Sequence, residues 1–119
     1  MKRVGLLLAL LVCGCAPSSR SALSIRLLPG PALHVQPSAE VVVELSVANR
    51  QLAAADVSAQ ADMRHPGMGT AVATVTPLGR GRYRLSNLDL PMAGDWVLSV
   101  KASTQGHPVS GAAAFSVLP

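Results

Sequence analysis

The sequence has few aromatic residues and few acidic residues. Its 119 residues include one Trp, one Tyr and one Phe, and 10 Lys or Arg stand against six Asp or Glu. Proteins that hold single-stranded nucleic acid stack the bases on aromatic side chains within a basic groove, and this chain has too few aromatic residues to build such a surface. The single basic cluster, Arg80, Arg82 and Arg84, indicates a solvated hairpin. We therefore expect no nucleic-acid partner.

Motifs for catalysis are also missing. The three histidines, His34, His65 and His107, fall in predicted loops, and no nucleophile motif surrounds any of them. No pair of carboxylates has an obvious reason for a raised pKa, and no glycine-rich phosphate loop follows a strand and opens a helix. We therefore expect that the protein is not an enzyme.

The N-terminus has the features of a bacterial lipoprotein signal peptide. Met1-Lys2-Arg3 is basic, and residues 4–12 are an apolar run that is too short for a membrane span of about 20 residues but typical of a signal peptide. The run ends in Val12-Cys13-Gly14-Cys15, which resembles a lipobox. The sequence thus predicts a signal peptide over residues 1–14 and a lipid on Cys15. The alternative is ordinary secretion with cleavage after Ala16.

Lipidation fixes the expected location and the cysteine chemistry of the remaining chain. Cys13 leaves with the signal peptide, so Cys15 is the remaining cysteine and we expect no disulfide. Two acyl chains are enough for stable anchoring, so we expect a protein of the cell envelope, held to the membrane by its lipid and facing the periplasm or the exterior. Ala16 after the lipidated cysteine favours the outer membrane in a Gram-negative cell. Residues 15–22 are predicted to be a tether, and residues 23–119 one domain.

The hydrophobic pattern of this domain repeats every two residues, as in β-strands with one buried face. Every second residue is apolar in two clear segments, Val41 to Val47 and Trp96 to Val100. The first contains Val41, Val43, Leu45 and Val47, and the second Trp96, Leu98 and Val100. Separated by turn signals, seven such strands predict an all-β fold, an immunoglobulin-like antiparallel β-sandwich. The expected strands are residues 22–28, 41–48, 56–63, 71–77, 82–90, 96–102 and 109–118.

One predicted strand changes its pattern along its length. Tyr83 and Leu85 share one parity, whereas Leu88 and Leu90 take the other. The sequence therefore predicts a β-bulge near Ser86-Asn87.

The methionines are placed where a metal site could form. Met63 and Met68 flank His65, and Met92 precedes the strand of Trp96. Antiparallel alternation places loops 64–70 and 91–95 at one pole, with His34 as a more distant candidate, and His107 at the opposite pole. Thioether sulfur together with imidazole suits Cu(I). We therefore expect a metal site formed by Met63, His65, Met68 and Met92, with copper as the cofactor; the alternative is that Met63 and Met92 only fill or cap the core.

Three segments carry a resemblance to a known family. They are Met63-Arg-His-Pro-Gly-Met68-Gly, then Gly81-Arg-Tyr83, then Met92-Ala-Gly94-Asp-Trp96-Val-Leu-Ser-Val100. Together they resemble the YtkA-like domain, whose pattern is Met-Pro-x-Met, then Gly-x-Tyr, then Met-x-Gly-x-Trp. Here Arg64-His65 precedes the proline, so either Met63 or His65 takes the place of the first Met. The resemblance implies an exported immunoglobulin-like sandwich, related to FixH-like proteins that are associated with copper handling and assembly of respiratory oxidases.

Two hypotheses for the function follow. The first is a membrane-tethered extracytoplasmic binding module that holds or delivers Cu(I) through the Met/His loops. The second is a metal-free interaction domain that docks an envelope protein or a respiratory complex, because methionine-rich loops are also adaptable protein-binding surfaces.

The lipid anchor leads to a first prediction. We expect Cys15→Ser to release the protein from the membrane fraction. The variant lacks the sulfur atom to which the predicted diacyl group is attached. Fractionation of cells followed by immunoblotting measures the release. Membrane retention of the variant with normal removal of the signal peptide would contradict the prediction.

Overall fold

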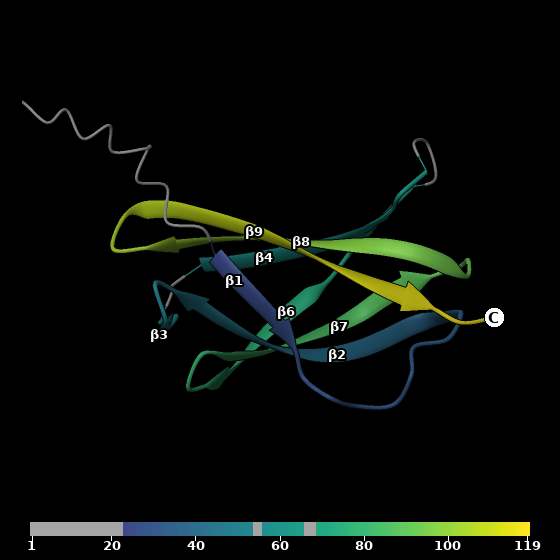
Figure 1. Ribbon diagram of the computed structural model, residues 1–119, viewed down its shortest axis with the longest axis horizontal. Coiled ribbons are helices and arrows are strands. Elements are labelled where there is room, and N and C mark those ends of the chain that lie inside the picture. Colours follow the sequence, from purple (N-terminus) through teal and green to yellow (C-terminus); the bar gives the residue numbers. More distant parts are fainter. Residues whose placement is uncertain (1–22, 54–55, 66–68) are drawn as a thin grey trace, which may run out of the picture.

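The computed structural model describes residues 23–53, 56–65 and 69–119, and this part of the chain forms nine β-strands (Figure 1). No helix in these residues is long and apolar enough to cross a membrane. The strands are β1 (Leu23–Leu27), β2 (Gln36–Val47), β3 (Arg50–Gln51), β4 (Asp56–Met63), β5 (Thr70–Val72), β6 (Thr74–Gly79), β7 (Arg82–Leu90), β8 (Gly94–Thr104) and β9 (His107–Val117).

The strands build two antiparallel sheets that pack face to face as a sandwich (Figure 1). The first sheet has the order β1-β2-β7-β6, with β3 paired to β2, and the second has the order β5-β4-β8-β9. The predicted all-β sandwich is confirmed. The number of strands is nine rather than seven: β2 starts five residues before the predicted position 41, and β3 lies where a turn was expected.

The predicted single strand over residues 71–77 is wrong. The chain instead crosses from one sheet to the other at Ala73, whose N–H donates to the carbonyl of Ala59 at 3.0 Å. Ala71 belongs to β5 of the second sheet, Val75 belongs to β6 of the first sheet, and Ala73 lies between them. All three pack against the core. The alternating pattern therefore continues through the crossing, which is why the sequence reads as one strand.

The predicted bulge in β7 is present. Leu85 pairs with Val41 and Leu88 pairs with Ala39, so two residues of β7 face one residue of β2. Asn87 has a φ of 59°, in the left-handed region that asparagine tolerates. The extra residue turns both Leu85 and Leu88 into the core.

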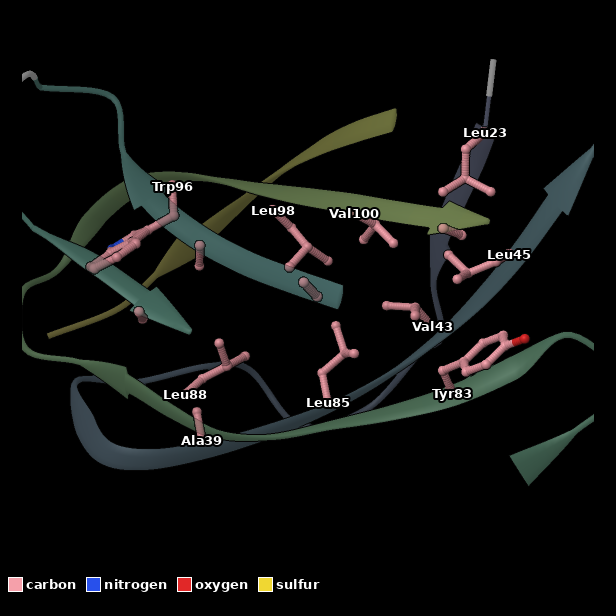
Figure 2. Packing of buried hydrophobic residues seen from close by; sticks show 14 of the residues in the cluster. Leu23, Ala39, Val43, Leu45, Tyr83, Leu85, Leu88, Trp96, Leu98 and Val100 are labelled. Atoms are coloured by element: carbon pink, nitrogen blue, oxygen red, sulfur yellow. The ribbon is translucent and has the colours of Figure 1, made fainter. Parts of the chain in front are cut away.

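The core lies between the two sheets and is apolar among the described residues (Figure 2). Tyr83 is buried in this core and carries a polar hydroxyl group. The hydroxyl donates a hydrogen bond to the carbonyl of Leu52 at 3.0 Å. Leu52 lies on the connection that leads from the first sheet to the second, so this bond holds the crossover on the core. The largest fully buried side chains are Trp96, Leu45, Leu85, Leu88, Leu90, Leu98, Val43 and Val100.

The connections between strands gather at the two ends of the sandwich (Figure 1). The tight turns β2–β3, β6–β7 and β8–β9 lie at one end, where β1 also begins because Leu23 pairs with Val47; we name this end the turn pole. The loops β1–β2, β4–β5 and β7–β8 lie at the other end with the last residues of the chain; we name this end the loop pole. His107, opposite Thr104 across the β8–β9 turn, is at the turn pole as predicted.

The edge strands β1 and β9 close one side of the sandwich through a glycine. A Cβ built on Gly111 of β9 would overlap the carbonyl oxygen of Leu23, so no side chain fits at this position. The backbones of the two sheets therefore approach each other directly at this point, and only glycine permits the approach.

This close contact predicts a large effect of a small change. We expect Gly111→Ala to lower the free energy of unfolding by about 1–3 kcal/mol, because the new methyl group pushes two backbones apart. Urea unfolding measures the loss. The matched control is Gly30→Ala, where nothing lies within 4 Å of the added Cβ; equal stability of the two variants would contradict the prediction.

The position of the indole leads to a second stability prediction. Trp96 is 1% exposed, so Trp96→Ala should lower the free energy of unfolding by about 3–5 kcal/mol, as other large-to-small changes of buried aromatic residues do. Val72→Ala is the control, since Val72 is 69% exposed and should change stability by less than about 0.5 kcal/mol. A loss below about 1 kcal/mol for the Trp96 variant would show that the indole does not support the core.

Candidate functional site

The candidate site lies at the loop pole, where the end of β4 meets the start of β8. Met63, the last residue of β4, is the direct cross-strand partner of Trp96. One residue further, the N–H of Arg64 donates to the carbonyl of Asp95 at 3.2 Å. The pairing continues to the strand ends, so the backbone that carries Met63 and the backbone that follows Met92 are held side by side.

Trp96 fixes the segment that carries Met92. Its indole N–H donates to the carbonyl of Met92 at 3.0 Å, four residues earlier in the chain. The ring is buried at the loop-pole end of the core (Figure 2) and stacks on Phe115 of β9, with ring centroids 6.4 Å apart. These two contacts restrict the indole, and its hydrogen bond holds the turn that carries Met92.

Gly94 leaves space for the side chain of Met63. A Cβ on Gly94 would lie 3.3 Å from the terminal methyl group of Met63, and the φ of Gly94 is 137°, a value that side-chain-bearing residues rarely adopt. The thioether of Met63 therefore lies against the turn that begins β8, two residues from Met92. Met63 is also half-buried and packs on the core, which agrees with the alternative core role expected for it.

The other predicted ligands differ in their surroundings. Met92 is 43% exposed, and His65 is exposed two residues after the end of β4. Met68 lies outside the described residues. The structure thus places Met63, His65 and Met92 at the loop pole, on both sides of the β4–β8 pairing.

His34 belongs to a different part of the loop pole. It forms an isolated bridge with Leu118, and its Nδ1 lies 3.3 Å from the carbonyl oxygen of Pro119. These contacts connect the β1–β2 loop to the end of the chain. They account for His34 without a ligand. No sequence pattern indicates these contacts, because the partners are about 85 residues apart along the chain.

A polar contact that the sequence analysis missed closes the β4–β5 hairpin. The carboxylate of Asp62 accepts hydrogen bonds from the hydroxyl of Thr70 and from the side-chain amide of Gln60, the latter at 3.0 Å. Asp62 and Thr70 are cross-strand partners, so they hold together the two ends of the loop that carries His65. Once the hairpin register is known, the spacing of these two residues identifies the pair.

The donor set at the loop pole is soft. No group of three or more His, Cys, Asp or Glu side chains in the described part of the chain is arranged to hold a metal ion. The ligands predicted at this pole are thioether sulfur and a single imidazole, a combination that suits Cu(I) better than Mg²⁺, Ca²⁺ or a four-ligand Zn²⁺ site.

Comparison with known proteins agrees with this architecture. A structure of a DUF4785 family protein from Legionella pneumophila superimposes with a TM-score of 0.52 and 16% sequence identity, over 81% of this chain and 28% of that one. At this identity the likeness shows the fold alone. No curated protein matches the sequence. The family profile described as YtkA-like matches residues 20–101, well over half of the sequence. The chain belongs to the YtkA-like family.

Proposed function

We propose that this protein is a lipid-anchored extracytoplasmic module that binds Cu(I) at its loop pole and passes it to a partner. A YtkA-like domain and an all-β sandwich are not typical of enzymes, so a binding role is favoured over catalysis. The proposed ligands are Met63, Met68, Met92 and His65, and the proposed anchor is the lipid on Cys15.

The observation that carries this proposal is the position of Met63 against Gly94. Because Gly94 has no side chain, the thioether of Met63 lies beside the turn that presents Met92. Two thioethers on neighbouring, fixed pieces of backbone form a preorganised pair of soft ligands, to which an exposed imidazole or a further thioether from the β4–β5 loop adds.

The different exposure of the two methionines suits transfer of the ion. Met63 is half-buried and supplies a partly dry side, which strengthens the metal–ligand interaction. Met92 is 43% exposed and leaves the ion open to an incoming ligand from a partner. Thioethers need no deprotonation, so binding should persist at mildly acidic pH better than in an all-histidine site.

A second candidate function is docking of an envelope protein without a metal. Three large apolar side chains are exposed at the loop pole, Val35 at 41%, Met92 at 43% and Leu118 at 44%. The N–H of Val35 donates to the carbonyl of Leu118 at 2.9 Å, so these two lie on neighbouring strands of backbone. Such a group of exposed apolar residues favours a protein contact, which a copper donor would also need.

Competition with a Cu(I) chelator tests the proposal on the purified protein. We expect one Cu(I) per chain, and Met63→Leu, Met68→Leu and Met92→Leu should each weaken binding roughly tenfold or more, because leucine keeps the volume but removes the sulfur ligand. Circular dichroism and urea unfolding confirm that each variant is folded.

The histidines supply a matched pair of variants. His65→Ala should weaken Cu(I) binding, whereas His107→Ala should leave it unchanged, since His107 is exposed at the opposite pole. If the parent protein binds no Cu(I), or if the methionine variants bind it as well as the parent does, the copper proposal is wrong and the docking function replaces it.

A further inference from the structure

The charged side chains are divided unequally between the two poles. Arg50 and Arg80 are exposed at the turn pole, and among the described residues neither forms an ion pair. Their neighbour Arg82 is paired with Glu44 at 3.6 Å. The other acid near this pole, Asp56, lines a depression together with Lys101, so one base offsets this acid in the charge of the pole. The turn pole therefore carries an excess of positive charge.

The loop pole has the opposite character. Asp89 near the end of β7 and Asp95 near the start of β8 are exposed there, and Arg64 is the exposed cation beside them. The backbone carbonyl of Asp95 accepts a hydrogen bond from the N–H of Arg64. Among the described residues, their side chains form no ion pair. The long axis of the sandwich thus runs from a basic end to an end where acids outnumber bases.

Tight turns keep the two free arginines at the tip of the turn pole. Ala48 and Asn49 both have positive φ, as a two-residue type I′ turn requires, and Arg50 follows them directly. Arg80 has a φ of 57° and lies between Gly79 and Gly81 in the β6–β7 turn. These two turns are too short to fold over the side chains that they carry.

A hollow opens beside Arg80. It has a volume of about 550 Å³ and lies between β3 and the β6–β7 turn, with Arg80 and Arg82 in its lining. Gly81 forms part of the wall, because a Cβ there would lie 3.0 Å from both the Leu45 carbonyl oxygen and the Cβ of Gln51. An arginine in the lining of a hollow can hold a phosphate group, and Arg80 is available for this because it forms no ion pair among the described residues.

The chain also enters the domain at this pole. Leu23, the first residue of β1, pairs with Val47 next to the β2–β3 turn, so a tether over residues 15–22 would arrive here. Eight residues reach at most about 28 Å, and the 11 residues of β8 span roughly 35 Å. Such a tether is too short for an upright domain to put its loop pole on the membrane, but it lets the domain lie on its side. Charge then decides whether the domain lies on its side or rests on its turn pole.

We propose that the turn pole rests on the anionic phospholipid surface of the membrane through Arg50 and Arg80, with the loop pole directed away from it. This inference rests on the lipid anchor of the proposed function. Each basic residue near an anionic surface raises the bound population roughly fivefold, so two give roughly 25-fold, and the tether makes the encounter intramolecular. Repulsion of Asp89 and Asp95 by the same surface acts in the same direction.

This orientation restricts the partner of the candidate site. The loop pole stands roughly 35 Å above the lipid headgroups, so Met92 and the exposed Val35 and Leu118 face the aqueous space. The partner is then a soluble protein, or a membrane protein with a domain that extends to this height, and not a site at the lipid surface.

Fluorescence quenching in vesicles tests the orientation on the full lipidated protein. A fluorophore is attached at Gln105→Cys on the turn pole or at Ala93→Cys on the loop pole, both exposed positions, and the vesicles contain brominated lipid. In vesicles of phosphatidylethanolamine and phosphatidylglycerol, we expect the label at position 105 to be quenched severalfold more than the label at position 93. In vesicles of phosphatidylcholine alone the difference should shrink to the smaller value that the position of the tether imposes.

Charge reversal supplies the control. Combining Arg50→Glu with Arg80→Glu should reduce quenching at position 105 to the level measured in phosphatidylcholine vesicles, whereas Arg64→Glu at the loop pole should leave it unchanged. Equal quenching of the two labels, no dependence on phosphatidylglycerol, or an equal effect of the Arg64 variant would overturn the proposal.

Two further measurements separate this proposal from the proposed function. Flotation with phosphatidylcholine vesicles reports the lipid anchor alone, because these vesicles carry no net charge. If the protein does not float, the anchor is wrong, while quenching in the phosphatidylglycerol vesicles still decides whether the turn pole binds. Cu(I) competition reports the loop pole independently of both.

Discussion

The hydrogen bond from the Trp96 indole to the Met92 carbonyl is the contact on which the loop pole depends. The ring fills the end of the core and stacks on Phe115, while its one polar atom fixes the turn that precedes β8. Gly94 lies between the bonded residues and leaves space for the Met63 side chain. A single buried residue thus supports the fold and also positions the two methionines, so the candidate site is built on rigid strand ends.

The two ends of the sandwich are suited to different tasks. At the turn pole the connections are short, and positive φ values at Ala48, Asn49 and Gln105 fix them tightly. At the loop pole the connections are longer and carry the sulfur and imidazole donors. Antiparallel strands running the full length of the domain separate these ends by most of its long axis. This separation permits one end to bind a surface while the other remains accessible, without any moving part.

Sequence reasoning succeeded where the chemistry is local and failed where two distant backbones meet. The alternating pattern around Trp96 predicted β8, the change of parity in β7 predicted the bulge at Asn87, and antiparallel alternation predicted that His65 and His107 lie at opposite poles. The crossing at Ala73 was missed because its alternation is uninterrupted. The approach of Gly111 to Leu23 was missed because a glycine in a strand does not reveal which backbone it faces.

The contact between β1 and β9 also affects how copies of the protein behave toward one another. Along β9, Leu23 lies against Gly111, and just beyond its end the backbone of Leu118 bonds to residues 33 and 35, so this edge is covered at two places. The opposite side presents β5, which has three residues, and β6, which contains Pro77. A proline removes a hydrogen-bond donor, and so short a strand offers few bonds to a neighbour. Among the described strands, the sandwich therefore offers little open edge for strand-to-strand aggregation.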